Sequence, residues 1–467
     1  MELPKAFIRN IGTLLGETEC RRLLEALEAE RTCSIRMNPV KSEGLEAIPD
    51  SSLSVVPWCT SGFSLSNRPA FTFDPLLHAG VYYVQEASSM FLEQALKQYV
   101  SSPVTMLDLC AAPGGKSTHA RSLLPDGSLL VANEVNRSRA QILAENLTKW
   151  GHPDVAVTNN DPADFSRLPA FFDVILTDVP CSGEGMFRKD PVAVQEWSEA
   201  NVELCRQRQR RIVAAVWQSL KPGGLLIYST CTYNTEENEE NVRWIRDELG
   251  ADVLSLDVPA EWHVTGNLLA GESFPVYRFL PHKTKGEGFF LAVLQKAGDM
   301  EKEELKGVNG GKEKKKKNVG GGGRPGASLS QIASDWLLAP DEYELEQIND
   351  RLIALPRCHL SALAAIRRSL RVVQAGVAVG EQKGRDLIPA HALAMSRILR
   401  RDAFAQAALT YEQAIAYLRR EAIVLPAETP RGYVLLTYQD VPLGFVKHIG
   451  NRANNLYPPE WRIRSQA

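Results

Sequence analysis

The stretch VTMLDLCAAPGGK, residues 104–116, decides the fold of this chain. The apolar run over 104–109 predicts a buried strand, the Pro113-Gly114-Gly115 turn ends that strand, and residues 116–124 have the pattern of a helix. A strand that passes through a tight turn into a helix is the opening unit of a sheet whose faces are covered by helices. The turn after this strand is therefore the first place to expect a ligand.

The same alternation continues downstream. Further strands are predicted at 128–132, 155–157, 172–176, 224–228 and 288–295, and helices at 137–150, 194–220 and 236–249. This succession predicts an α/β fold with a mostly parallel, Rossmann-like sheet between two layers of helices. Ligands of such sheets bind beyond the carboxyl ends of the strands, so the residues that follow each strand are the candidates for a functional site.

The residues of the first turn allow two kinds of ligand. The letters GKST over 115–118 are similar to the end of a phosphate-binding P-loop, but that motif needs a glycine where this chain has Cys110. The alternative is a cofactor that contains adenosine, for which small residues allow close backbone approach and a later acid binds the ribose hydroxyls. Glu134 stands 20 positions after Gly114. We therefore expect an adenosyl cofactor at this turn.

Two cysteines follow later strands directly. Cys181 comes after the fourth strand and Cys231 after the fifth, so parallel geometry places both thiols in one crevice beside the cofactor turn. A thiolate that adds to C6 of cytosine makes C5 able to take a methyl group. Asp178, three residues before Cys181, is placed to stabilise such an adduct near ring N3. A structural disulfide is the alternative, and the residues alone leave open which cysteine attacks.

Three segments carry a resemblance to a known family. LDLCAAPGGKS (107–117), DVPCSGEGMFRKDP (178–191) and YSTCTYNTEENE (228–239) together resemble the Nop/Sun family of RNA cytosine-5 methyltransferases. The whole chain resembles the bacterial RsmF-like branch of that family, which acts on 16S ribosomal RNA. The tail GYVLLTYQDVPLGFVKHIGNRANNLYP (432–458) is similar to the PUA-like module that ends those enzymes.

The resemblance implies roles for particular residues. It makes Cys231 the nucleophile and Cys181 the thiol that assists release of the methylated product; Asp178 joins them as a catalytic residue through its position three residues before Cys181. It places S-adenosylmethionine on Cys110, Ala111, Ala112, Pro113, Gly114, Gly115, Lys116, Glu134, Asp161 and Asp178. Lys189 is the RNA contact that it implies, and Val179 replaces the alanine common in that loop. The core motifs do not distinguish ribosomal from transfer RNA.

Composition divides the chain. The predicted regions are an N-terminal α+β accessory RNA-binding region (1–95), a methyltransferase catalytic domain (96–297), a Gly/Lys-rich linker (298–329) and a C-terminal basic region (330–467) that includes the PUA-like module (about 400–467). Residues 351–467 hold 17 Lys and Arg against 8 Asp and Glu, although the whole chain has a net charge of −3. A basic module on an acidic body predicts a polyanionic partner, here ribosomal RNA or the 30S subunit.

Composition also excludes several classes of protein. With 467 residues, of which 44% are hydrophobic, the chain can bury a core, and no apolar run comes near the roughly 18 residues of a membrane span. The first residues lack the pattern of a secretory signal. Eight cysteines without a CxxC pair or a close Cys/His cluster predict no metal and a reducing, cytoplasmic location. We expect a monomeric enzyme; the alternatives are the same chemistry on transfer RNA, a P-loop-like NTPase and a non-catalytic RNA-binding protein.

Overall fold

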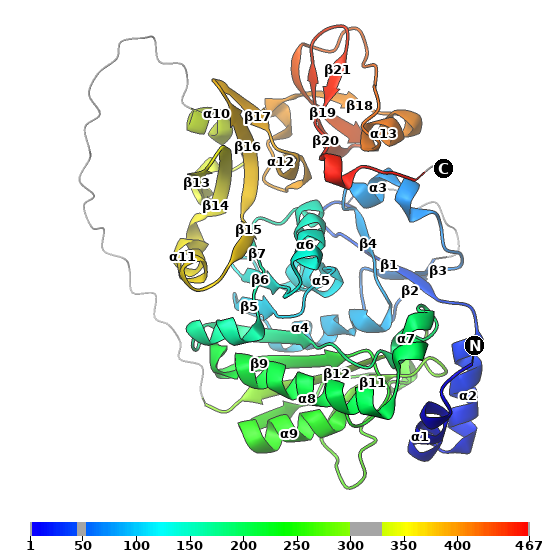
Figure 1. The fold of residues 1–467 in the computed structure, drawn as a ribbon. Coiled ribbons are helices and arrows are strands. Elements are labelled where there is room, and N and C mark those ends of the chain that lie inside the picture. Colours follow the sequence, from blue (N-terminus) through cyan, green and yellow to red (C-terminus); the bar gives the residue numbers. More distant parts are fainter. Residues whose placement is uncertain (1, 44–52, 299–328, 466–467) are drawn as a thin grey trace.

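The structure is a computed structural model that describes residues 2–43, 53–298 and 329–465 (Figure 1). Within these residues the largest sheet has nine strands in the order β10-β12-β9-β8-β5-β6-β7-β15, with β11 paired to β12. Its strands are β5 (Thr105–Asp108), β6 (Leu129–Asn133), β7 (Val155–Thr158), β8 (Phe172–Asp178), β9 (Leu220–Thr230), β10 (Ala251–Leu254), β11 (Tyr277–Phe279), β12 (Phe289–Lys296) and β15 (Val372–Ala375). The five central strands run parallel and the outer ones antiparallel, which confirms the predicted α/β class.

Both faces of this sheet are buried under helices. Successive side chains of a strand point to opposite faces, so Leu130 and Ala132 of β6 join one core cluster and Leu129 and Val131 join the other. Helices α4 (Leu92–Tyr99), α5 (Gly115–Leu123) and α6 (Arg137–Trp150) supply the first cluster, and α8 (Glu199–Val216), α9 (Glu239–Leu249) and α11 (Leu360–Ser369) supply the second. Because both faces of the sheet are buried, the sequences of its strands are continuous apolar runs.

The predicted single helix over 194–220 is wrong. The chain forms α7 (Pro191–Glu196) and then α8, separated by two residues in extended conformation. Ser198 begins α8 because its hydroxyl accepts the backbone N–H of Asn201 at 3.1 Å, a typical N-terminal cap. Trp197 leaves the helical path so that its indole N–H donates to Glu184 at 2.9 Å. Strand β9 also begins earlier than predicted, at Leu220.

The N-terminal region combines two helices with a small antiparallel sheet. Its elements are α1 (Lys5–Leu15), α2 (Glu17–Glu28), β1 (Cys33–Met37), β2 (Ser54–Val55), β3 (Gly62–Leu65), α3 (Pro75–His78) and β4 (Tyr82–Val84), with the strand order β2-β3-β1-β4. The ring of Phe7 in α1 packs edge-on against Phe187 and Trp197, with centroids 5.1 and 5.6 Å away. The N-terminal helices therefore support the segment that follows Cys181.

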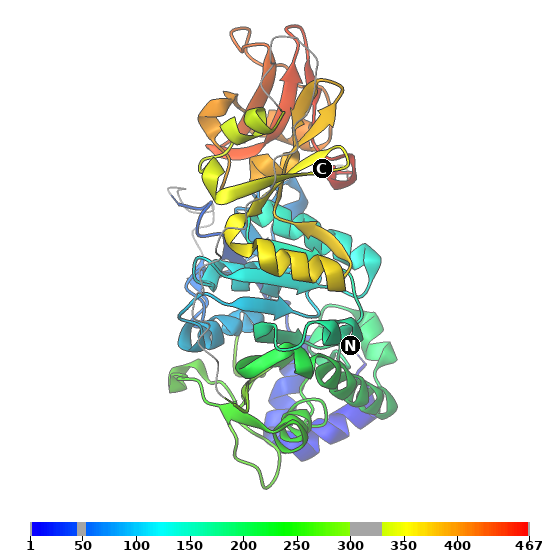
Figure 2. The same ribbon diagram turned by 90° about the vertical axis from the view of Figure 1, so that its left-hand side faces the viewer.

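The C-terminal region forms two further sheets, which lie together at one end of the molecule (Figure 2). The first has β13 (Tyr343–Ile348), β14 (Arg351–Pro356), β16 (Val377–Lys383) and β17 (Asp386–Pro389); the second has β18 (Ala405–Ala408), β19 (Gly432–Tyr438), β20 (Val441–His448) and β21 (Ala453–Asn455). Helices α10 (Leu329–Asp335), α12 (His391–Met395) and α13 (Tyr411–Leu418) accompany them. No described helix is both long enough and apolar enough to span a bilayer.

The C-terminal region also completes the large sheet. Strand β15 pairs antiparallel with β7, and the N–H of Gly376 donates to the carbonyl of Val155 at 3.1 Å. Helix α11 covers the face beside it with Leu363 and Ile366. The catalytic domain predicted to end at residue 297 thus takes a helix and an edge strand from the region after it. Most of the predicted linker, 298–329, lies outside the described residues.

Candidate active site

The turn between β5 and α5 borders a hollow at the carboxyl end of the sheet. Gly114 has a φ of +115°, which favours glycine, and a Cβ there would lie 3.3 Å from Leu143 Cδ1. A cavity of about 170 Å³ opens beside the turn. Six of the seven predicted turn residues line it together with Asp178: Cys110, Ala111, Ala112, Pro113, Gly115 and Lys116. Small side chains on this wall let a ligand approach the backbone closely.

A buried carboxylate lies in the wall of this cavity. Asp108 is fully buried, and its Oδ2 accepts the hydroxyl of Ser117 at 2.6 Å. Its Oδ1 has no hydrogen-bond partner among the described residues. Burial raises the pKa of Asp108 to about 7. A buried polar atom without a partner is costly, so a ligand that donates a hydrogen bond into this cavity would satisfy it.

Two predicted cofactor acids lie beyond the residues that line the cavity. Glu134 follows β6, is nearly buried, and accepts the backbone N–H of Asn136 at 2.9 Å, with Arg139 3.5 Å from its other oxygen. Asp161 is exposed and accepts the backbone N–H of Ala163 at 2.9 Å. Their contact with a cofactor stays a prediction.

Lys116 is held by an acid of the same site. Its Nζ lies 2.8 Å from Asp178 Oδ2, and Ser229 donates its hydroxyl to Asp178 Oδ1 at 2.8 Å. Burial lowers the pKa of Lys116, but the Asp178 and Cys231 side chains outweigh this and raise it overall. A lysine tied to an internal carboxylate is unlike the P-loop lysine, which reaches a bound phosphate. The geometry therefore gives no support to the nucleotide-phosphate alternative.

The two cysteines meet at the end of adjacent parallel strands. Asp178 of β8 is in register with Ser229 of β9, so the residues that follow the two strands lie side by side. The Sγ atoms of Cys181 and Cys231 are 3.2 Å apart, and both cysteines are free. The hydrogen bond to Cys231, together with burial, raises the pKa of Cys181 well above its ordinary value. At neutral pH Cys181 is therefore a neutral thiol beside Cys231.

Buried carboxylates fix the two cysteine loops relative to each other. Glu184 accepts the backbone N–H groups of Tyr233 and Asn234 at 2.6 and 3.1 Å. Glu237 reaches back and accepts the backbone N–H of Ser182 at 3.0 Å, while Asn234 Nδ2 donates to both carboxylates. Each loop thus carries an acid that binds the backbone of the other loop.

The acid Glu237 gives the folded protein a measurable pH dependence. Burial raises its pKa to about 7 from an ordinary value of 4.5, so its ionisation opposes folding increasingly between these two pH values. Glu237→Gln removes this ionisation. We expect the unfolding free energy of the variant, relative to wild type, to rise by about 3 kcal/mol between pH 4 and pH 8. Urea unfolding across this range measures it.

A neighbouring acid provides the control for this measurement. Glu236 is half-buried and precedes Glu237 directly, so Glu236→Gln makes the same chemical change without removing the buried charge. Its difference from wild type is expected to stay constant with pH. Parallel pH profiles for Glu237→Gln and wild type would contradict the prediction.

Within residues 187–190, Lys189 has a basic side chain that no described ion pair occupies. Phe187 is buried, Arg188 forms a buried ion pair with Glu287 at 2.7 Å, and Asp190 caps α7 through the N–H of Val192 at 2.9 Å. The Lys189 side chain is half-exposed and has no ion pair among the described residues. Its contact with RNA stays a prediction.

Several residues of the site were missed by the sequence analysis. The segment after β4 lines the cavity with Tyr83, Gln85, Glu86 and Ser89. A short apolar run over 81–84 precedes Gln85, so the strand-end rule that predicted the other residues could have found it. Glu184 and Glu237 stand inside the quoted motifs, but no letter of the sequence shows that an acid is buried.

Three profiles of known families match most of the chain. The profile described as 16S rRNA methyltransferase RsmB/F matches residues 99–295, the N-terminal domain of 16S rRNA methyltransferase RsmF matches 3–87, and the methyltransferase RsmF PUA domain matches 405–463. These matches agree with the predicted methyltransferase core, N-terminal region and PUA-like module.

Individual relatives extend the likeness over nearly the full length. Ribosomal RNA small subunit methyltransferase F of Klebsiella pneumoniae is 32% identical over 471 residues, covering 98% of this chain and 96% of that protein. The protein of the same name from Erwinia tasmaniensis is 29% identical over 480 residues, with the same coverage. Among solved structures, a methyltransferase homologue from Pyrococcus horikoshii is 28% identical with a TM-score of 0.53, covering 63% of this chain and 95% of that chain.

Proposed function

Because the chain belongs to the RsmB/F family of 16S rRNA methyltransferases, we propose that it methylates C5 of a cytidine in 16S ribosomal RNA with S-adenosylmethionine as methyl donor. The observation that carries the cytosine chemistry is the pair of thiols, Cys181 and Cys231, 3.2 Å apart beside the cavity-lining Asp178. The names of the relatives support the RNA substrate.

The residues around the cavity suit S-adenosylmethionine. Small side chains from Cys110 to Gly115 allow close contact with the ligand, and the free Oδ1 of Asp108 can accept a hydrogen bond from its amino group. Glu134 follows the next strand, where an acid binds ribose hydroxyls in comparable sheets; Asp161 and Lys116 complete the proposed set. When bound, the cofactor supplies an electrophilic methyl group on a positively charged sulfur.

The two thiols and Asp178 supply the rest of the chemistry. The target cytidine leaves its stack to enter the site, and the Cys231 thiolate forms a bond to C6. Asp178, held in place by Lys116 and Ser229, passes a proton to N3, which neutralises the negative charge that thiolate addition leaves on the ring. Once C5 carries the methyl group, its proton passes to water, the C5–C6 double bond re-forms, and the bond between C6 and Cys231 breaks with its electron pair returning to sulfur, a release that Cys181 assists.

The remaining regions hold the RNA. The C-terminal basic region binds it through phosphate contacts and shape, and Lys189 contributes a contact near the cysteine loops. We assign the chain to the cytoplasm, where 16S RNA and 30S subunits are present, and infer that it works as a monomer.

Methyl transfer from tritium-labelled S-adenosylmethionine tests the proposed function. The protein is incubated separately with 16S RNA, 30S subunits and bulk transfer RNA, and the labelled nucleoside is identified after digestion. Label in 5-methylcytidine from 16S RNA or 30S subunits is the expected result. Label from transfer RNA alone would keep the chemistry and overturn the substrate, whereas label in a different nucleoside would overturn the cytosine chemistry.

Lys189→Gln is expected to weaken RNA binding by the loss of a single phosphate contact. The slope of log affinity against log salt concentration should become shallower by about 0.7 to 0.9, because fewer counterions are released. S-adenosylmethionine affinity should not change, since Lys189 does not line the cavity. Filter binding over a range of salt concentrations measures the slope, and an unchanged slope would remove Lys189 from the RNA interface.

A further inference from the structure

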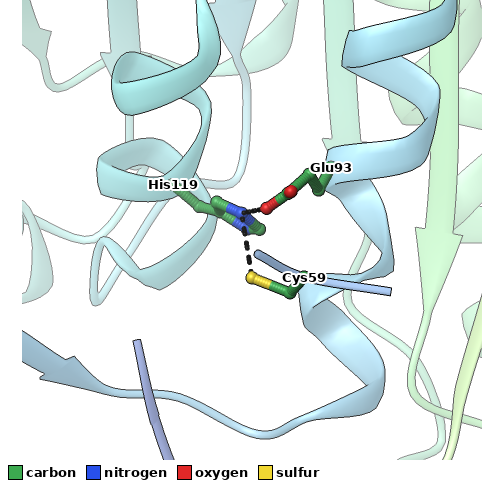
Figure 3. A group of neighbouring side chains, drawn as sticks. All are labelled: Cys59, Glu93 and His119. Carbon is green, nitrogen blue, oxygen red and sulfur yellow. Dashed lines mark hydrogen bonds and ion pairs between the residues drawn. The ribbon is translucent and has the colours of Figure 1, made fainter. Parts of the chain in front are cut away.

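A second cluster of reactive side chains lies outside the active site. Cys59 precedes β3, Glu93 belongs to α4 and His119 belongs to α5, and Figure 3 shows their side chains converging. One ligand atom from each residue lies within 4.8 Å of the others, and all three residues are at most 1% exposed. The cysteine and the histidine are 60 positions apart in the chain, so no spacing rule would reveal the cluster. From this cluster we propose that Cys59, Glu93 and His119 bind a structural zinc ion.

The distances in the cluster match the edges of a zinc coordination sphere. Cys59 Sγ lies 3.7 Å from His119 Nε2, and this nitrogen lies 3.1 Å from Glu93 Oε2. Tetrahedral zinc with ordinary bond lengths separates a sulfur ligand from a nitrogen ligand by about 3.5 Å, and a nitrogen ligand from an oxygen ligand by about 3.3 Å. Two of the three separations therefore match a zinc sphere to within a few tenths of an ångström, and the third, between Cys59 Sγ and the Glu93 carboxylate, lies within 4.8 Å.

The surroundings of Glu93 leave one of its oxygens directed at the cluster. Oε1 receives the N–H and hydroxyl of Thr60 at 3.0 and 2.9 Å and the Lys97 ammonium at 2.6 Å. Oε2 faces His119. A carboxylate that is held through one oxygen and offers the other is the arrangement that second-sphere hydrogen bonds give to metal ligands.

The ligand set selects the kind of metal. Thiolate and imidazole favour zinc over the hard cations magnesium and calcium, which prefer oxygen ligands. On binding, the Cys59 thiol releases its proton to water and the thiolate forms the bond to zinc. A water molecule or the Ser61 hydroxyl, 3.7 Å from Cys59 Sγ, can fill the fourth position.

The position of the cluster gives the ion a structural role. It would join the N-terminal region, through Cys59, to α5, the helix that begins at the cofactor turn. Zinc would thus fasten this helix from its buried side without touching the reacting groups. Its presence can be tested without measuring activity, so the two proposals fail independently.

Metal analysis of the full chain tests the site. The protein is purified after growth with added zinc, and its zinc content is measured by mass spectrometry. Wild type is expected to hold one zinc per chain, which Cys59→Ser and His119→Gln each lose. Cys33→Ser is the matched control, because Cys33 is also buried in the N-terminal region but lies outside the cluster, and it should keep the ion.

A spectroscopic readout separates loss of a ligand from loss of fold. Cobalt(II) in the wild-type site is expected to show the charge-transfer band of a cobalt–thiolate bond. Cys59→Asp should remove this band but keep the d–d bands of tetrahedral cobalt, which an unfolded chain would not show. Wild type without zinc and without the cobalt–thiolate band, or zinc retained by Cys59→Ser, would overturn the proposal.

Discussion

Cys231→Ala is expected to slow methyl transfer by about 10⁴-fold or more, because the variant has no atom that can bond to C6 of the cytosine. Without this bond C5 is not nucleophilic, so neither the cofactor nor the second thiol can compensate. S-adenosylmethionine affinity should change little, since Cys231 is not among the residues that line the cavity. Tritium transfer at saturating cofactor measures the rate, and calorimetry measures the affinity.

Cys358→Ala is the matched control for the loss of a thiol. Cys358 is exposed and belongs to the short segment before α11, so its loss should leave the rate unchanged. Normal turnover by Cys231→Ala would show that the nucleophile is another group. A rate and a cofactor affinity that fall together would point to a damaged fold instead.

Cys181→Ala is expected to trap the enzyme on its RNA as a covalent complex that survives a denaturing gel. In this variant Cys231, the proposed nucleophile, can still add to C6, but the thiol that lies 3.2 Å from its Sγ, and to which we assign release, is gone. Most of the enzyme should accumulate as this complex after the first addition and migrate with labelled RNA. The rate over many turnovers should fall by roughly 10²-fold or more, the typical loss when a proton-transfer group is removed.

The double variant shows which thiol forms the covalent complex that appears as a band on the denaturing gel. Cys181→Ala combined with Cys231→Ala should form no covalent complex, because the nucleophile is then missing. If only Cys231→Ala gave such a band, Cys181 would be the nucleophile and Cys231 the thiol that assists release.

The sequence predicted the parts of the site that follow local rules. Strand ends are local features, so Asp178, Cys181 and Cys231 could be placed together before any coordinates. The 3.2 Å contact confirms the proximity of the two thiols, and the hydrogen bond from Ser229 joins Asp178 to the strand that leads to Cys231. The cofactor turn could be predicted for the same reason, because small residues and the Pro113-Gly114-Gly115 turn follow the first strand directly. The roles of the two cysteines stay predictions that the variants above test.

Other features depend on contacts that no local pattern records. The break between α7 and α8 follows from a hydrogen bond of Trp197 to Glu184, which lies 13 residues earlier. Burial of Glu237 depends on Ser182, Gln209 and Asn234. The three proposed zinc ligands come from separate segments that meet only in the folded chain. Amphipathic periodicity cannot predict such long-range contacts. It shows which side of a helix or strand is buried, but not which other segment packs against that side.

The pairing of β15 with β7 determines when the large sheet can be completed during translation. Thr158 and Val372 are partners, yet more than 200 residues leave the ribosome between them. Until β15 emerges, the outer edge of β7 is unpaired in the nascent chain, and an open strand edge is a template for aggregation. A protein cut between residues 298 and 360 would keep every proposed catalytic residue and still lack the strand and the helix that close its sheet. The catalytic fold is therefore finished only in the last fifth of translation, after its chemistry has already been encoded.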